Sequence, residues 1–365
     1  MARAPQEAEP LPQSDRIEGL SHPRETAELI GHEAQKRAFM DAIGSGRLHH
    51  AWLLAGPRGL GKASFAYQAA ATLLTRNGAF GYNDAHPGAG RIRQGSHGNM
   101  RVLTRQWDPA GKKFRANIRV DEVRALTPFF GSSAAEEGPR IVIVDCADDM
   151  NINAANALLK SLEEPPKDGF YFLVAHAPGR LLPTIRSRCR TLSFAPLSDA
   201  DVAAVMRRAM PHLTDAEAQA FARLSDNAPG RALELALAGG LELFQALIDL
   251  FEGLPELDGL AAAGLADEIG AAGADARFDL ALVLLRGWLR RLARGAALGQ
   301  PVSDLVLLKG EDGPARALSA LGPEKLISLH DQLGEWAGQT KGLYLDRRQN
   351  FLRMAEALAG ACRGR

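Results

Sequence analysis

A glycine-rich turn between an apolar strand and a helix is the feature that most restricts the fold of this chain. Residues 52–55 are apolar, and the seven residues that follow read Gly-Pro-Arg-Gly-Leu-Gly-Lys. Gly56, Gly61 and Lys62 form the GxxxxGK pattern, with Gly59 between them. In this pattern the backbone N–H groups at a helix N-terminus surround phosphate groups, and the lysine reaches the outer phosphates. The turn therefore predicts a phosphate-loop α/β domain with a parallel sheet.

Two positions of this site lack the residues that ATP hydrolysis requires. Lys62 is followed by Ala63, where Ser or Thr would bind Mg²⁺, and Ser64 points elsewhere because one step along a helix turns a side chain by about 100°. Asp145 ends a second apolar strand as the magnesium-side carboxylate, but Cys146 follows where a glutamate would activate water. A thiol is mostly protonated at neutral pH and is a poor base, so we interpret Cys146 as a small buried hydrophobe. We predict either weak ATP or ADP binding or none, and no hydrolysis.

The pattern of apolar residues divides the chain into segments. Over residues 23–196 short β-branched runs alternate with helical stretches, which predicts a parallel sheet with flanking helices. Residues 197–365 are rich in Ala, Leu and Arg at helical spacing, which predicts an all-α part. Residues 1–22 combine acidic residues with prolines and are interpreted as a flexible arm. Within the sheet domain, residues 76–100 are expected to form a long loop and residues 105–120 a hairpin.

Composition excludes several classes of protein. The 43 basic and 43 acidic residues give a formal net charge of zero, which argues against coating nucleic acid or a membrane surface by bulk electrostatics. The three cysteines include no CxxC pair, so they predict neither a disulfide framework nor a cysteine-rich zinc site. No run approaches the roughly 18 apolar residues of a membrane span. We expect a protein of the reducing cytoplasm.

Four ordered motifs resemble one known family. They are LIGHEAQKRAF at residues 29–39, GRLHHAWLLAGPRGLGK at 46–62, MNINAANALLKSLEEPP at 150–166, and Ser-Arg-Cys at 187–189. Together they resemble the bacterial clamp-loader ATPases of the AAA+ class, which belong to DNA polymerase III. The resemblance is strong over about residues 23–235 and weak beyond. It implies an AAA+ nucleotide-binding-type domain followed by a helical lid and a helical collar.

The resemblance implies a role for one arginine. In the family, the arginine of Ser-Arg-Cys enters the nucleotide site of a neighbouring subunit, and this position is Arg188 here. A trans arginine finger stabilises transition-state charge and contributes about 10³–10⁵ in rate. Arg188 is therefore expected to be catalytic for a site on another chain. Arg186 and Arg190 are assigned no role.

The resemblance also shows where this chain departs from the family's sensors. Gly230 occupies the position of a lid sensor arginine, and Arg231, one residue later, is expected to point away from it. His176 stands where a small polar residue is usual, and we interpret it as a strand-end histidine. Both positions add to the expectation of a degenerate site.

Many members of the family carry a four-cysteine zinc module between the phosphate loop and the acidic strand. Residues 63–144 of this chain contain no cysteine, and His86 and His97 are too few for a four-ligand site. We therefore expect no zinc or other metal, with the loop at 76–100 in place of the module.

The helical part leaves two questions open. The resemblance implies a lid over residues 197–240 and a collar over 241–365 that packs against the collars of other subunits. One apolar stripe in the collar forms either such a packing surface or the core of its own domain: Leu282, Leu285, Trp288, Leu289 and Leu292. The nearby arginines are interpreted as a solvated face rather than a nucleic-acid surface: Arg286, Arg290, Arg291 and Arg294.

The combined expectation is a non-hydrolysing clamp-loader subunit that acts as a scaffold, supplies Arg188 and requires no cofactor. The implied partners are subunits of the gamma/tau and delta types, the sliding clamp, and primed DNA held by the whole assembly, without a membrane. Two alternatives stay open at this point. One is an active ATPase of the gamma type, and the other is a nucleotide-sensing switch that acts alone.

Overall fold

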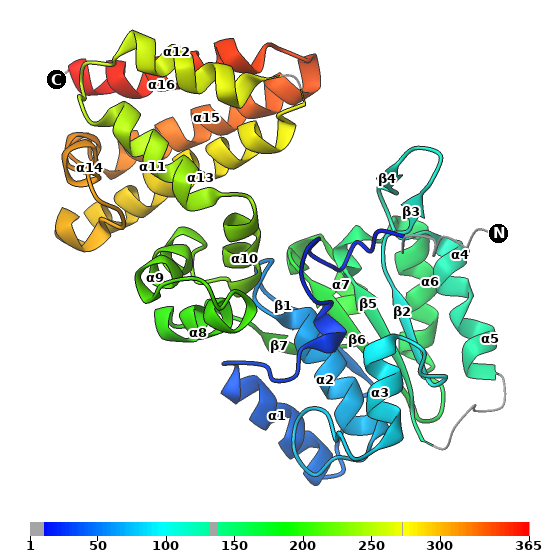
Figure 1. Ribbon diagram of the computed structural model, residues 1–365. Helices are drawn as coiled ribbons and strands as arrows, with labels where there is room; N and C mark the ends of the chain where they lie inside the picture. Colours follow the sequence, from blue (N-terminus) through cyan, green and yellow to red (C-terminus); the bar gives the residue numbers. More distant parts are fainter. Residues whose placement is uncertain (1–10, 132–137, 272, 365) are drawn as a thin grey trace, which may run out of the picture. The chain divides into compact units, whose positions relative to one another are not determined.

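A computed structural model describes residues 11–131, 138–271 and 273–364 (Figure 1). The chain divides into two compact units. The first unit comprises Met1–Asp201 together with Ala228–Gly230, and the second comprises Val202–Asn227 and Arg231–Arg365. Each unit is considered by itself below.

The first unit contains a five-stranded parallel sheet in the order β2-β5-β6-β1-β7. Its strands are β1 (Ala51–Ala55), β2 (Met100–Leu103), β5 (Arg140–Asp145), β6 (Gly169–Ala175) and β7 (Arg190–Ser193). Strand β1 leads into the glycine-rich turn, and β5 ends at Asp145. Because all strands are parallel, the turn and Asp145 lie at the same edge of the sheet. The predicted domain with a parallel sheet is confirmed.

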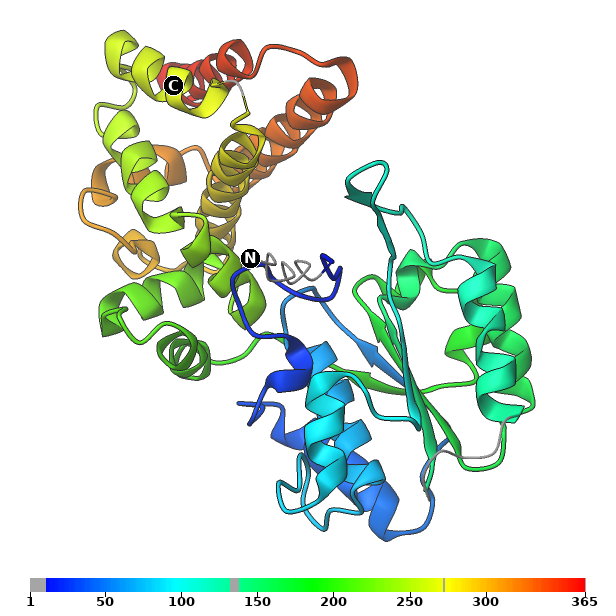
Figure 2. The ribbon, with the colours of Figure 1, turned by 45° about the vertical axis from the view of Figure 1, so that its right-hand side comes forward.

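Helices cover both faces of this sheet (Figure 2). They are α1 (Glu33–Gly44), α2 (Lys62–Leu74), α3 (Pro87–Gln94), α4 (Val120–Arg124), α5 (Leu126–Gly131), α6 (Ile152–Glu163) and α7 (Pro183–Arg186). Successive strand residues point to opposite faces: Trp52 and Leu54 pack in the core with α1 and α2, whereas Leu53 packs in the core with α4 and α6. Burial of both faces explains the continuous apolar strands seen in the sequence.

The second unit is helical, as predicted. Its helices include α9 (Asp215–Leu224), α11 (Gly240–Phe251), α12 (Gly259–Gly270), α13 (Asp275–Ala297), α14 (Asp312–Ser319), α15 (Pro323–Leu343) and α16 (Arg347–Arg363), while α8 (Asp199–Ala209) and α10 (Pro229–Leu237) cross the boundary between the units. Helix α13 packs along α15. Its predicted apolar stripe is buried: Trp288, Leu285, Leu289 and Leu292 are 0% exposed and Leu282 is 6% exposed. The stripe therefore belongs to the core of this unit. The division between a lid and a collar stays a prediction.

Two segments differ from the sequence expectation. Residues 76–100, expected as a loop, contain helix α3, which His86 caps by accepting the N–H of Gly88. The arm expected to be flexible has a buried anchor: the Asp15 side chain is 5% exposed and pairs with His22, which is 1% exposed. Residues 1–10 of that arm lie outside the described residues. The predicted hairpin is confirmed as β3 (Trp107–Asp108) paired with β4 (Lys113–Phe114).

No helix in the described ranges combines the length and apolar character that a membrane span requires.

Candidate functional site

The glycines of the turn have backbone conformations that other residues rarely adopt. Gly56, Gly59 and Gly61 have φ angles of 150°, 85° and 80°. A Cβ atom at Gly56 would lie 2.4 Å from the carbonyl oxygen of Phe194, so space also requires glycine there. Helix α2 begins directly after Gly61, at Lys62. The predicted strand, phosphate loop and helix are therefore present.

The Lys62 side chain turns back onto its own loop. Its ammonium donates hydrogen bonds of 2.6 Å and 2.5 Å to the carbonyl oxygens of Gly56 and Pro57. The residue is 2% exposed. Burial lowers the pKa of Lys62 to about 8, against the opposing charges of nearby acids. The group that would bind outer phosphates thus already has acceptors within the loop.

Two hydrogen bonds and one close approach within the first unit hold the loop in place. The N–H of Gly230 donates a 2.7 Å hydrogen bond to the carbonyl of Gly59. The Nε2 atom of His32 lies 2.7 Å from the carbonyl oxygen of Leu60. A Cβ atom at Gly61 would lie 3.2 Å from a methyl group of Leu29. Sequence reasoning predicted the loop but none of these closing contacts.

Asp145 lies at the end of β5 as predicted, but its carboxyl group is poorly suited to hold Mg²⁺. Burial and the charge of Asp15 raise the pKa of Asp145 to about 7, against the opposing charge of Lys62. The carboxyl group is therefore substantially protonated at neutral pH. A protonated carboxyl is a weaker ligand for a hard cation than a carboxylate.

Cys146 joins a small hydrogen-bonded network beside Asp145. Its thiol donates to Asp148, and Asp148 also accepts the backbone N–H groups of His176 and Ala177, at 3.0 Å and 2.9 Å. Burial raises the pKa of Cys146, so the thiol stays protonated. Burial alone would raise the pKa of Asp148, but the bonds from Cys146, His176 and Ala177 outweigh it and the pKa is lowered. Cys146 is buried, as interpreted from sequence, and also acts as a donor.

His176 follows the last residue of β6, in agreement with its interpretation as a strand-end histidine. Burial and the nearby charge of Lys62 lower its pKa to about 4, so the ring is neutral at pH 7. Its Nδ1 atom is buried without a hydrogen-bond partner among the described residues. The ring cannot serve as a cation for phosphate.

Arg188 lies on the surface of the first unit, between α7 and β7. Its Nη2 atom pairs with Glu163 at 2.7 Å, and its Nη1 atom donates to the carbonyl of Thr184 at 3.0 Å. The Arg188 side chain is 35% exposed. Arg186 is exposed, whereas the guanidinium of Arg190 lies 5.0 Å from the ring centre of Trp52.

Several known proteins are similar to this chain. Residues 31–198 match the family model described as DNA polymerase III, delta subunit. Over 212 residues the chain is 38% identical to the DNA polymerase III subunit delta′ of Pseudomonas aeruginosa, covering 57% of this chain and 58% of the relative. Over 207 residues it is 33% identical to the delta′ subunit of Bacillus subtilis, covering 54% and 60%.

The chain is also similar to another subunit type. The chain is 30% identical over 191 residues to the DNA polymerase III subunit gamma/tau of Mycobacterium tuberculosis, covering 51% of this chain and 31% of the relative. The chain thus spans about three fifths of the length of the delta′ relatives it matches. The names of these relatives are those of the delta′ subunit type.

Arg231, considered as a replacement for the family's sensor arginine, is bound within the second unit. Its Nη1 atom donates to Asp226 at 3.0 Å, and Asp226 also accepts from Arg290. Gly230 stands at the expected sensor position itself, and its backbone N–H is hydrogen-bonded to the carbonyl oxygen of Gly59.

His86 and His97 both lie near helix α3. A Cβ atom at Gly88 would lie 2.9 Å from Nδ1 of His86 and 3.3 Å from Nε2 of His97. Across the described ranges, no three His, Cys, Asp or Glu side chains gather as a metal site would require. The expectation of no zinc stays a prediction.

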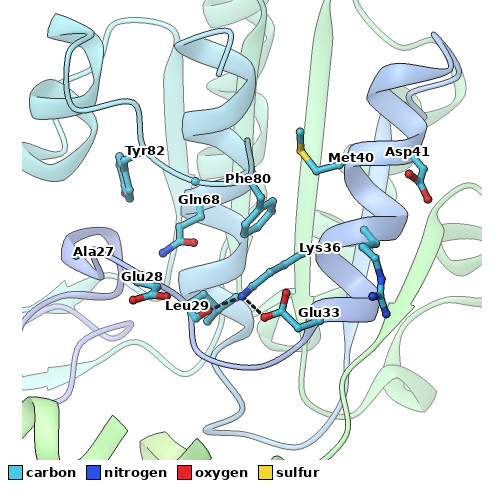
Figure 3. A pocket seen from close by; sticks show the side chains of 12 residues that line it. Ala27, Glu28, Leu29, Glu33, Lys36, Met40, Asp41, Gln68, Phe80 and Tyr82 are labelled. Atoms are coloured by element: carbon cyan, nitrogen blue, oxygen red, sulfur yellow. Dashed lines mark hydrogen bonds and ion pairs between the residues drawn. The ribbon is translucent and has the colours of Figure 1, made fainter. Parts of the chain in front are cut away.

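A separate pocket of about 440 Å³ lies against α1 and α2 (Figure 3). Its lining includes Met40, Gln68 and Phe80, and Lys36 crosses it to bond the carbonyl of Leu29 and the carboxylate of Glu33. The residues described as lining it exclude Gly56–Lys62, so this pocket is distinct from the phosphate loop.

Two buried polar groups escaped sequence reasoning. Asp15 accepts a 3.3 Å hydrogen bond from Tyr67, 52 residues away, and no local spacing predicts such a pair. Arg291, interpreted as part of a solvated face, is instead 14% exposed and paired with Glu311, which is 0% exposed. That interpretation was wrong because the helix that carries Arg291 is covered on this side by the segment around Glu311.

Proposed function

We propose that this protein is the delta′ subunit of a bacterial replicative clamp loader, which does not hydrolyse ATP and supplies Arg188 to the ATP site of a neighbouring subunit. The observation that carries the proposal is the phosphate loop whose lysine is bound by the carbonyls of Gly56 and Pro57. With Ala63 and Cys146, the chain lacks the hydroxyl that would bind Mg²⁺ and the glutamate that would activate water. The names of the delta′ relatives support the same subunit.

The retained chemistry is that of Arg188. A guanidinium placed on the γ-phosphate of a neighbour's ATP stabilises charge that develops in the transition state. Arg188 suits this role because it lies at the surface and keeps unused N–H groups. The protein then works as a scaffold that completes a partner's active site.

The proposed partners follow from this role. They are a gamma/tau-type subunit, whose site would receive Arg188, a delta-type subunit, the sliding clamp, and primed DNA held by the assembly. No cofactor is required by this chain, and we expect the complex in the cytoplasm.

The direct test of the finger is Arg188→Ala in a loader reconstituted with its gamma/tau and delta partners. We expect DNA-stimulated ATP turnover to fall by at least about 10³-fold at the affected site. Arg186→Ala is the matched control, since Arg186 is an exposed arginine two residues before Arg188, at the end of α7. Normal turnover and clamp loading with Arg188→Ala would show that the proposed role is wrong.

The degenerate site has its own test in the isolated chain. We expect no magnesium-dependent ATP turnover, and only weak binding of a fluorescent nucleotide that Mg²⁺ does not strengthen. Appreciable turnover abolished by Lys62→Ala would favour an active ATPase of the gamma type instead.

A further inference from the structure

The partner of Arg188 comes from a different helix and a distant part of the sequence. Glu163 is the last residue of α6, and Arg188 follows α7. Their side chains meet at 2.7 Å. We propose that Glu163 is a positioning residue that holds the guanidinium of Arg188 in the orientation a neighbour's ATP site receives. This inference rests on the function proposed above for Arg188.

Glu163 is the last residue of a well-anchored helix, and Arg188 lies two residues after the end of another. Leu158 and Leu162 of α6 and Ile185 of α7 are at most 2% exposed and belong to the same core cluster. The positions of Glu163 and of the backbone near Arg188 are therefore fixed by shared packing. An ion pair between two rigid elements holds a long side chain better than one on a mobile loop.

The two contacts restrain the guanidinium of Arg188 but engage only some of its N–H groups. One N–H is donated to Glu163 and one to the carbonyl of Thr184, from two different helices. A guanidinium has five N–H groups, so three remain for a phosphate. The rotamer freedom of a long arginine side chain is thus partly lost before the partner arrives, which favours docking. Orientation matters at such sites, because a displacement of about 1 Å can cost about 10²-fold in rate.

The opposite effect of Glu163 would be to mask the charge of Arg188. Masking is weak where water screens the carboxylate, and the Glu163 side chain is 49% exposed. The two effects have opposite signs: removal of a positioning group slows the partner's turnover, whereas removal of a masking group speeds it. The sign of the change therefore decides between them.

The expected size follows from the exposure of the pair. Exposed ion pairs are weak, so loss of the Glu163 charge should reduce turnover by only about two- to fivefold. Loss of the finger itself should cost about 10³-fold or more. The two roles are therefore separable by magnitude.

The test uses the full chain in complexes purified with gamma/tau and delta subunits, assayed with clamp and primed DNA. Glu163→Gln should lower the kcat of DNA-stimulated ATP turnover about two- to fivefold and leave the KM for ATP unchanged. Glu163→Asp, which keeps the charge, should restore part of the loss. Glu164→Gln is the matched control, since Glu164 is the adjacent exposed acid. Adding Glu163→Gln to Arg188→Ala should have no further effect.

The outcomes distinguish this inference from the proposed function. If Arg188→Ala leaves turnover intact, the finger and its positioning residue both fail. If Arg188→Ala abolishes turnover while Glu163→Gln matches wild type or exceeds it, only the positioning role fails. A Glu163→Gln defect that Glu163→Asp shares fully, with a lowered melting temperature, would show a structural role and overturn the proposal.

Discussion

The amide of Gly230 donates a 2.7 Å hydrogen bond to the carbonyl oxygen of Gly59 in the phosphate loop. A Cβ atom at Gly230 would lie 2.9 Å from the Cα atom of Gly59, which is closer than side chains approach backbone. The position where the family carries a sensor arginine is therefore closed by backbone packing. A side chain at residue 230 and this loop conformation exclude each other.

Gly230→Ala should consequently destabilise the first unit. Because the clash is with backbone, we expect a loss of about 1–3 kcal/mol in the free energy of unfolding, measured by urea denaturation. Gly90→Ala is the control, since Gly90 lies in α3 with no neighbour within 4 Å and should be neutral or slightly stabilising. Equal stability of Gly230→Ala and wild type would show that the contact is not tight.

Asp145 should make stability depend on pH. Its pKa is raised to about 7 by burial and by Asp15, so between about pH 4 and 7 the folded protein holds a proton that the unfolded chain has released. Stability from this group is present at low pH and is lost as pH rises through about 7. Asp145→Asn mimics the protonated form and should melt at a higher temperature than wild type at pH 8 but not at pH 4.

The control for this pH profile is Asp41→Asn, an exposed carboxyl on α1. This substitution should leave the difference in melting temperature between pH 4 and pH 8 the same as in wild type. If the melting temperatures of Asp145→Asn and wild type differ by the same amount at pH 4 and at pH 8, the pKa of Asp145 is not raised.

Asp15 should fasten the N-terminal segment to α2. Its carboxylate accepts hydrogen bonds from His22 at 3.1 Å and Tyr67 at 3.3 Å. Burial alone would raise the pKa of Asp15, but the hydrogen bond and charge of His22 lower it overall. The contribution of Asp15 to stability is therefore present above the pKa of an ordinary carboxyl group and is lost as the pH falls below it. Asp15→Asn should cost about 1–3 kcal/mol at pH 7 and speed proteolysis near the N-terminus, whereas exposed Glu18→Gln should do neither. Equal protease resistance of the two variants would contradict the anchor.

The buried pair of Arg291 and Glu311 should be essential to the second unit. Glu311 is 0% exposed and also accepts the N–H groups of Leu307 and Leu308, at 2.7 Å and 3.2 Å. Removing Arg291 leaves a buried carboxylate without its cation, so Arg291→Met should destabilise by about 3–5 kcal/mol. Arg294→Met, exposed on the same helix, should change stability by less than about 0.5 kcal/mol in the same denaturation experiment.

The sequence by itself determined the features that depend on local chemistry. Positive φ angles require glycine at Gly59 and Gly61, and continuous apolar runs such as β5 require a strand buried on both faces. The absence of a hydroxyl at Ala63 and of a carboxylate at Cys146 is likewise visible without a structure. These features predicted the sheet domain and led to the proposal of a degenerate ATP site.

Only the tertiary structure decided how charged groups are paired. Lys62 binds its own loop, Asp15 raises the pKa of Asp145, Arg188 meets Glu163, and Arg291 is buried against Glu311. Each of the last three pairs joins separate elements, and the energy of a charge depends on burial and on partners that folding brings together. Residue spacing contains neither quantity, which is why Arg291 looked solvated in the sequence and is buried in the fold.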